Sequence, residues 1–338
     1  MKNCIYLLLI ALVTCEKPEK ETNSDTIYNQ WVNYFNINNY KTYYSISSLA
    51  MKNNSNVFFS TFGCVDTSTI MLISNNDLIN YDSSQFSLID ESLDILCPES
   101  GEVMWYSNDL VIVHDKNAIN CDYWTIYDIN TRKRSSKLKI DSYNNLWVAS
   151  DDGMKFFDGQ NWESYYKGSA FWAICFDNDY NLYASTIPDF DEPGIILKYD
   201  YKTWDTLVIC SEKAKWVPCM HFDNENNLWF GVLSRWAVAP ESGDGLYKYD
   251  GNNFTQFHIY NSELPSNSII DIAIDKYNNK WIGTYSGGLA KLNNNEEWKI
   301  FNTDNTPMPF NSIEHIVIDN DNDVWLAIQF YGLAKLTE

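Results

Sequence analysis

The feature that most constrains the fold of this chain is a repeated pattern, an aspartate followed six residues later by an aromatic residue. The aspartate begins a polar turn rich in asparagine, and a small residue follows two positions after the aromatic one. A Gly with an apolar neighbour then precedes the next polar turn. The five strongest copies begin at Asp141, Asp177, Asp223, Asp275 and Asp319.

Weaker copies of the same pattern extend upstream, where Lys52 and Pro98 take the place of the first aspartate. Each copy divides into four short apolar or aromatic segments separated by Asp, Asn and Gly turns, residue types that bond their own backbone or tolerate left-handed conformations. Repeats of roughly 40 to 50 residues with four strands each are typical of propeller blades. The sequence therefore predicts an all-β fold, a β-propeller.

The two ends of the chain predict the number of blades. The last copy ends at Glu338, after its third strand. Trp31 precedes Ile46 by 15 positions, as Trp298 precedes Ile313. We therefore expect the N-terminal segment to be an outer strand that completes the last blade. The prediction is a single seven-bladed β-propeller over residues 27–338 whose ring is closed by the N-terminal strand, which removes exposed sheet edges.

The first residues indicate export from the cytoplasm. Lys2 and the apolar run from Ile5 to Val13 favour a signal peptide over residues 1–14, since the run is shorter than the roughly 20 residues that span a bilayer. The end of this run resembles a bacterial lipobox, which implies lipidation at Cys15. Residues 15–26 are polar and predict a lipid-anchored tether. The expected location is the cell envelope, at the outer membrane. The alternative is that residues 1–14 are an ordinary secretory signal and that Cys15 occurs there by chance.

Composition narrows the partners and the chemistry. The formal charge of −21 repels phosphate backbones, which excludes nucleic acid as a partner. No Cys-x-x-Cys spacing occurs, so zinc knuckles and redox motifs are not expected. The cysteines after Cys15 either form disulfides or act as small core residues. They are Cys64, Cys97, Cys121, Cys175, Cys210 and Cys219.

The repeat from Asp through Asn-Asn-Leu-Trp to Gly-Leu and Tyr-Asp resembles the two-component regulator propeller repeat. The resemblance is strong over residues 139–338 and weaker over the 90 residues or so before them. It implies a propeller of the kind found in the sensor part of bacterial hybrid histidine kinases. This sequence holds one propeller and no kinase, so the resemblance implies a stand-alone lipoprotein that cannot signal by itself.

Strand direction places the longer loops on one face of the predicted propeller, and these loops are rich in aromatic residues. Exposed rings favour stacking on sugar faces or on apolar ligand patches. The alternative is that each ring packs over its own blade. The longest insertion runs from Leu233 to Asp244. The candidate ligand-binding residues are Trp172, Trp216, Arg235, Trp236, Tyr285 and Phe330.

The first strand of each repeat should line a central channel. Because side chains alternate along a strand, we expect one of two sets of residues to face the axis. The set four positions before each repeat start is Ser48, Asp94, Lys137, Ala173, Cys219, Asp271 and His315. The set two positions before is Ala50, Leu96, Lys139, Cys175, His221, Ala273 and Val317. These residues could polarise a ligand or hold a cation, or simply line a solvated channel.

The sequence predicts no cofactor, no metal and no catalytic residue. The Asp-rich stretch at Asp319 offers oxygens as calcium loops do, but it lacks the Gly and the Glu that such loops require, and it recurs as a turn. Serine-hydrolase, zinc-protease and phosphate-loop motifs are absent. The leading hypothesis is non-catalytic binding of a glycan or protein partner. The alternatives are a propeller lyase or lactonase using His315 with His221 or Glu314, and a structural subunit of a surface complex.

Overall fold

The computed structural model describes the chain in several ranges, and its described part is built from strands. Side chains are described for Ile46, residues 48–51, Val57, residues 59–60 and most positions from Lys137 onward. Within these residues no helix is long and apolar enough to cross a bilayer. The described backbone covers 31–36, 43–53, 56–63, 69–74, 77–81, 93–96, 103–107, 110–114, 124–128, 137–187, 194–208, 215–234 and 243–337.

The described strands pair into seven antiparallel sheets. The first contains β2 (Tyr43–Asn53), β3 (Asn56–Gly63), β4 (Thr69–Ser74) and β5 (Asp77–Tyr81). The second contains β6 (Leu93–Leu96), β7 (Val103–Ser107), β8 (Leu110–His114) and β9 (Trp124–Asp128). The third contains β10 (Lys137–Ile140), β11 (Leu146–Ser150), β12 (Gly153–Phe157) and β13 (Trp162–Tyr165).

The remaining sheets follow the same meander. The fourth contains β14 (Ala170–Phe176), β15 (Leu182–Ile187), β16 (Ile195–Tyr199) and β17 (Trp204–Val208). The fifth contains β18 (Lys215–Trp216), β19 (Met220–Phe222), β20 (Leu228–Ser234), β21 (Gly245–Tyr249) and β22 (Phe254–Phe257). The sixth contains β23 (Ile269–Ile274), β24 (Lys280–Thr284), β25 (Leu289–Leu292) and β26 (Trp298–Phe301). The seventh contains β27 (Ile313–Ile318), β28 (Val324–Ile328), β29 (Gly332–Leu336) and β1 (Trp31–Asn36).

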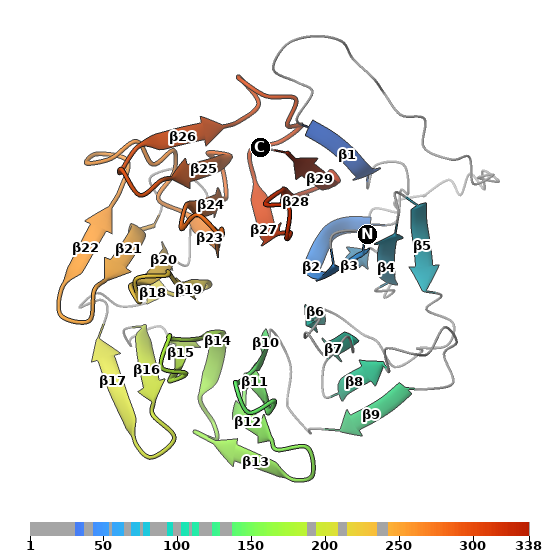
Figure 1. Ribbon diagram of the computed structural model, residues 1–338, viewed down its shortest axis with the longest axis vertical. Helices are drawn as coiled ribbons and strands as arrows, with labels where there is room; N and C mark the ends of the chain where they lie inside the picture. Colours follow the sequence, from blue (N-terminus) through green and yellow to red (C-terminus); the bar gives the residue numbers. More distant parts are fainter. Residues whose placement is uncertain are drawn as a thin grey trace, which may run out of the picture.

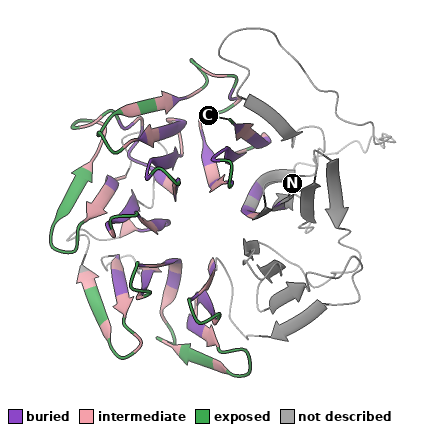
Figure 2. Ribbon diagram, in the orientation of Figure 1, coloured by how far each residue is buried: buried purple, intermediate pink, exposed green. Residues whose placement is uncertain are grey.

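The sheets stand around a common centre, the arrangement of a β-propeller, with the first strand of each sheet innermost (Figure 1). The second strands β11, β24 and β28 are buried throughout, whereas the outer strands β13 and β22 include exposed residues (Figure 2). The N-terminal strand β1 pairs antiparallel with β29, and Trp31 lies opposite Leu336. The segment that the sequence marked as an outer strand thus pairs at the outer edge of the last sheet.

The repeated aspartate organises the turn between the first and second strands. In the fifth sheet, Asp223 Oδ1 accepts hydrogen bonds from the backbone N–H groups of Glu225 and Asn227 at 3.0 and 2.9 Å. Its Oδ2 accepts one from the indole Nε1 of Trp229 at 2.8 Å. Asn226 adopts a left-handed conformation with φ of 66°, which asparagine tolerates better than most residues. The aspartate and the tryptophan six residues later therefore form one buried unit.

The same unit recurs at Asp141, Asp275 and Asp319, each of which accepts a hydrogen bond from its own indole. At Asp319, Oδ1 accepts from two backbone N–H groups and Oδ2 lies 3.3 Å from Lys335 Nζ. Both carboxylate oxygens of Asp319 thus interact with donors of the protein itself. The Asp-rich stretch forms a turn, as its recurrence in the sequence indicated.

Neighbouring sheets are joined by the tryptophans and by polar contacts between turns. Trp281 packs in one cluster with Ile313 and Ile316 of the next sheet, and Trp325 packs with Ile46 and Val57 of the first sheet. The repeated tryptophan thus fills the gap between neighbouring sheets.

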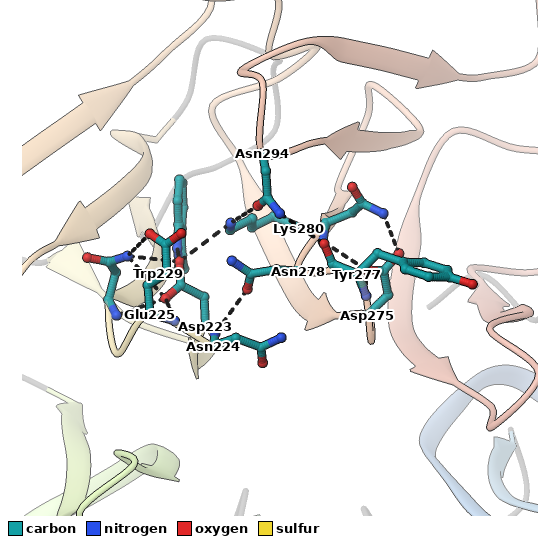
Figure 3. A network of polar contacts seen from close by, with 11 residues as sticks. Asp223, Asn224, Glu225, Trp229, Asp275, Tyr277, Asn278, Lys280 and Asn294 are labelled. Atoms are coloured by element: carbon teal, nitrogen blue, oxygen red, sulfur yellow. Dashed lines mark hydrogen bonds and ion pairs between the residues drawn. The ribbon is translucent and has the colours of Figure 1, made fainter.

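The polar contacts between turns link the fifth and sixth sheets directly (Figure 3). The N–H of Asn224 donates to Asn278 Oδ1 at 2.9 Å. Lys280 Nζ lies 3.4 Å from Asp223 Oδ2, and both side chains are buried. Burial raises the pKa of Asp223, but its hydrogen bonds and Lys280 outweigh this effect and hold the pKa below its usual value. The turn unit therefore also joins one sheet to the next.

Candidate functional site

A β-bulge recurs in the innermost strands and decides which side chains reach the central axis. The pairing of the first strand with the second is interrupted at one point in each of three sheets. The interruption lies after Ile269 in the sixth sheet, after Ile313 in the seventh and after Phe171 in the fourth, and regular pairing resumes at Asp271, His315 and Ile174. In the fifth sheet, Pro218 lies at the equivalent position, between the separately paired strands β18 and β19. Proline within a sheet is confined to edges and bulges, so this break fits the same local geometry.

The bulge lets one strand serve two surfaces. Ile269 and Ile313, before the bulge, are fully buried between sheets. Asp271 and His315, two residues later, line the central cavity. Without the extra residue, positions two apart would share one face. The bulge thus separates an apolar anchor from a polar cavity-facing side chain.

The central cavity has a volume of about 310 Å³. Both sets of residues considered from the sequence contribute to its wall, including Lys137 and His315 from one set and Lys139 and His221 from the other. The expectation that only one set faces the axis was wrong, because positions four and two before the repeat start are two residues apart and share a face. The side chain of Asp94 lies outside the described residues.

Asp271 joins two innermost strands at the wall of this cavity. Its Oδ1 accepts a hydrogen bond from its neighbour's N–H, that of Ile272, at 2.9 Å, and its Oδ2 accepts one from the N–H of Ile316 at 2.8 Å. His315 Nδ1 lies 3.8 Å from Oδ2. Burial raises the pKa of Asp271, but His315, Lys137 and the Ile316 N–H outweigh this effect and lower it overall. The cavity therefore holds a carboxylate in its ionised form at neutral pH.

His221 and two cysteine thiols near the axis are kept neutral. Burial, together with the positive charge of Lys139, lowers the pKa of His221 to about 4, against an opposing effect of Asp271. Burial raises the pKa of the Cys175 thiol to about 12 and that of Cys219 well above its usual value. Both thiols are free and buried, which fits the interpretation that they are small core residues. The other four cysteines lie outside the described residues.

On the face that carries the longer loops, Trp172 and Trp216 lie together. Their ring centroids are 5.5 Å apart and their planes are inclined by 47°. Trp172 occupies the bulge of β14, and Trp216 belongs to β18 of the next sheet. Both rings are partly exposed, whereas the neighbouring Phe171 is fully buried. The structure thus brings two of the six candidate residues into contact from positions 44 residues apart in the chain.

A second aromatic group combines Phe330 and Tyr331, from the turn between β28 and β29, with Phe310, from the loop before β27. Phe330 is 47% exposed and adopts a left-handed conformation with φ of 63°. Its ring centroid lies 6.0 Å from that of Phe310, and Phe310 lies 5.9 Å from Tyr331. Sequence reasoning did not include Phe310, which lies in the loop just before the first strand β27. No described contact joins this group to the tryptophan pair.

The other candidates are placed less completely. Tyr285 follows β24, is partly buried, and donates its N–H to the carbonyl of Ser268 at 2.9 Å. Arg235 and Trp236 lie outside the described residues, as does Cys15. The ends of the segment that carries Arg235 and Trp236 are described. Trp216 pairs with Leu233 at one end, and Lys215 Nζ lies 2.6 Å from Asp244 Oδ1 at the other.

Comparisons with known proteins indicate the fold. No protein-family model and no curated protein match the chain. Among solved structures, the extracellular domain of the hybrid two-component system BT3049 from B. thetaiotaomicron is similar, with a TM-score of 0.67 and 16% identity over 88% of this chain and 40% of that one. PorZ, a surface component of the type-IX secretion system of Porphyromonas gingivalis, has a TM-score of 0.63 and 16% identity over 88% of this chain and 46% of that one.

YCF48, solved bound to D1 peptide, has a TM-score of 0.64 and 13% identity over 93% of this chain and 98% of that one. The chain therefore spans less than half the length of BT3049 and PorZ, but nearly all of YCF48. At these identities the similarity establishes the fold. The similar structures include an extracellular domain of a two-component system, a surface component of a secretion system and a protein solved with a bound peptide.

Proposed function

We propose that this chain is a non-catalytic propeller of the bacterial cell envelope that binds a protein partner through the face carrying Trp172 and Trp216. The tilted, half-buried pair of indoles supports this proposal. Two large rings inclined by 47° form an apolar notch rather than a flat platform, and a notch suits an apolar side chain better than a sugar face. Arg235 and Trp236 belong to the proposed site, because the segment that carries them begins and ends beside β18.

The similar structures support a protein partner more than a glycan. YCF48 was solved with a peptide, and PorZ is a component of a surface system. Tyr285 and Phe330 extend the proposed surface around the same face, since loops after second strands and before first strands emerge on one side of an up-and-down sheet. A glycan partner is the alternative, and the experiment below separates the two.

Site-specific photocrosslinking in cells tests this proposal. A photoreactive residue at position 216 should capture a defined partner, whereas one at Tyr277, which is 63% exposed on the opposite, turn-bearing face, should not. With the purified partner, Trp172→Ala and Trp216→Ala should weaken binding by about 1–3 kcal/mol. Equal crosslinking at 216 and 277 contradicts the proposal. Indole fluorescence that changes with oligosaccharides in the wild type but not in Trp172→Ala would instead identify a glycan site.

We further propose that the seven described sheets are the blades of one closed ring over residues 27–338. The pairing of β1 with β29 supports closure, and so do the contacts of β2 with both β6 and β27. Deleting residues 31–36 should expose the edge of β29 and cost much of the stability, because an unpaired edge leaves backbone groups without partners. A deletion variant with an unchanged melting temperature contradicts closure by this strand.

Lipid anchoring at Cys15, with residues 1–14 as signal peptide and 15–26 as tether, completes the proposal. The support is the sequence pattern, together with neighbours described as an extracellular domain and a surface component. Membrane fractionation of the wild type and Cys15→Ala tests it. The wild type should sediment with the outer membrane and the variant should not. Equal release of both into the soluble fraction contradicts the anchor.

A further inference from the structure

The loops that lead into the first strands of the sixth and seventh sheets are built alike. Residues 258–268 precede β23 and residues 302–312 precede β27. In each loop the first N–H donates to an asparagine Oδ1 three residues later, at 2.8 and 2.9 Å, and the second N–H donates to an asparagine Oδ1 eight residues later, at 2.9 and 2.8 Å. A hydroxyl donates to the first carbonyl of the loop at 2.9 and 2.7 Å. The two loops are therefore one scaffold used twice, and they can be compared position by position.

The turns between the second and third strands of these two sheets correspond as well. Their flanking strands pair in the same register, so both turns have the same length. The N–H of Tyr285 donates to the carbonyl of Ser268 at 2.9 Å, and the N–H of Gln329 donates to that of Ser312 at 3.0 Å. Each turn is thus held to the loop beside it by the same hydrogen bond.

Three positions that lie together on this shared scaffold differ in the same direction. The sixth sheet carries small residues there, and the seventh carries aromatic residues, which we call the aromatic triad. The triad Phe310, Phe330 and Tyr331 stands where the sixth sheet has Ser266, Ser286 and Gly287. The first two positions are neighbours in both sheets, since the hydroxyls of the two serines lie 3.4 Å apart and the centroids of the two phenylalanine rings 6.0 Å apart.

Packing does not explain the triad. Phe310 and Phe330 remain 38% and 47% exposed, whereas Ser266 is fully buried. Phe330 adopts a left-handed conformation with φ of 63°, which bulky residues seldom adopt, and Ser286 does not. Backbone strain of this kind is concentrated at functional sites. The seventh sheet therefore carries exposed rings and strain that the fold does not require, since the sixth sheet forms without them.

The seventh sheet also loses a polar contact at these positions. In the sixth sheet, Ser266 Oγ accepts a hydrogen bond from the N–H of Ser268 at 3.2 Å. Phe310 offers no acceptor at the equivalent position, and the buried hydroxyl of Ser312 has no hydrogen-bond partner among the described residues. A buried polar group without a partner lowers stability. An arrangement that lowers stability and leaves rings exposed indicates a contact with another molecule.

The chemistry of the triad and the charge of the chain indicate what the triad contacts. Two of its three rings have no hydrogen-bonding group, which suits an apolar side chain better than the hydroxyls of a sugar. The chain as a whole has a formal charge of −21, and the exposed Asp304 lies in the loop that carries Phe310. A surface of this sign attracts basic segments and repels acidic ones.

We propose that the aromatic triad is a second contact site for the protein partner and holds an apolar side chain of a basic segment that reaches it from the Trp172–Trp216 notch. The inference rests on the proposed function, because it assigns a further part of the same partner-binding face. The seventh sheet lies across the central opening from the fourth, which carries Trp172 (Figure 1). A partner that makes both contacts therefore crosses the mouth of this opening.

Photocrosslinking separates this inference from the proposed function. A photoreactive phenylalanine analogue at position 330 replaces one ring by a similar ring, and its adducts in cells are identified by mass spectrometry beside those of position 216. We expect the same protein at both positions and none at Tyr277 on the opposite face. A defined partner at 216 with none, or a different protein, at 330 overturns the inference and leaves the proposed function intact. No partner at 216 overturns both.

Affinity measurements with the purified partner supply a matched test. Phe310→Ser and Phe330→Ser install the residues of the sixth sheet, and each should weaken binding by at least about tenfold. Both should leave the midpoint of urea unfolding unchanged or higher, because exposed rings and a strained residue are removed. Tyr260→Ser removes a ring that is 80% exposed from the loop of the sixth sheet, and it should not change the affinity.

Wild-type affinity in both phenylalanine variants overturns the inference. A fall in the urea midpoint as large as that expected for a buried ring also overturns it, because the rings would then serve the fold. Added salt should slow association, since the charge of this chain steers a basic segment toward it. An association rate that does not change with salt overturns the basic character of the partner.

Discussion

The Asp turns and the wall of the central cavity both involve the first strand of each repeat. The residues of the turns recur from repeat to repeat, whereas the residues of the cavity wall differ. At Asp223, Asp275 and Asp319 the carboxylate, the indole and the backbone donors recur with nearly the same distances. At the cavity the equivalent positions hold residues as different as Lys137, Asp271 and His315. Positions that hold the sheets together repeat along the chain, and positions that face the axis do not.

Physical constraints explain this difference. Each Asp turn buries a carboxylate, and burying a carboxylate costs free energy unless hydrogen-bond donors surround it. A substitution that removes one of these donors should therefore lower the stability of the protein. The cavity wall is solvated on one side, and a substitution there removes little packing. Substitutions in the Asp turns should therefore lower the stability of the fold. Substitutions in the cavity wall should change the pH dependence of stability.

The largest effect should come from breaking an Asp turn. Asp223→Ala removes the acceptor of two backbone N–H groups and of the Trp229 indole, and leaves buried Lys280 without its counter-ion. We expect the free energy of unfolding in urea to fall by about 3–5 kcal/mol.

The matched control for this variant is Asp250→Ala. Asp250 accepts two backbone N–H groups in a similar local pattern, but it is exposed and contacts no indole. It should lower stability far less. Equal losses from the two variants would mean that the backbone turn, and not the buried carboxylate–indole unit, carries the stability.

A smaller effect should appear as pH dependence at the axis. His221 has a pKa of about 4 in the folded protein and an ordinary value near 6.5 when unfolded. Between these values the unfolded chain binds a proton that the folded protein does not, so stability should fall as pH decreases from about 6.5 to 4. Allowing for the partial exposure of the ring, the loss is about 1–3 kcal/mol.

Urea unfolding of the wild type and His221→Asn at pH 7, 5.5 and 4.5 measures this contribution. Asp271 and His315 remain in both proteins, so the difference between the two curves reports on His221. The curves should diverge as pH falls. Parallel curves would show that the ring does not stay neutral in the folded protein.

The smallest effect on stability should come from a cavity lysine. Lys139→Met removes a charge but preserves the aliphatic stem, so the free energy of unfolding at pH 7 should change by less than about 1 kcal/mol. The pKa of His221, followed by NMR, should rise, because Lys139 lowers it. A variant as destabilised as Asp223→Ala would remove the distinction between the two surfaces.

Much of this architecture was predictable because its causes are local. The aspartate and the tryptophan of each unit are six residues apart, and the asparagines that adopt left-handed conformations lie between them. The spacing of Trp31 from Ile46 likewise predicted the edge strand that pairs with β29. Such features depend on hydrogen bonds and strand lengths within one repeat, and the strong copies repeat them, so the sequence alone determines the all-β repeat and the order of its strands.

Only the tertiary structure decided which side chains meet at the candidate sites. The bulge in the innermost strands is invisible in the hydrophobic pattern, yet it turns Ile269 inward between sheets and Asp271 toward the axis. The contact between Trp172 and Trp216, and the gathering of Lys139, His221 and Asp271 from three strands, join residues far apart in the chain. These arrangements depend on how whole sheets pack around a centre, and no spacing within a single repeat encodes that geometry.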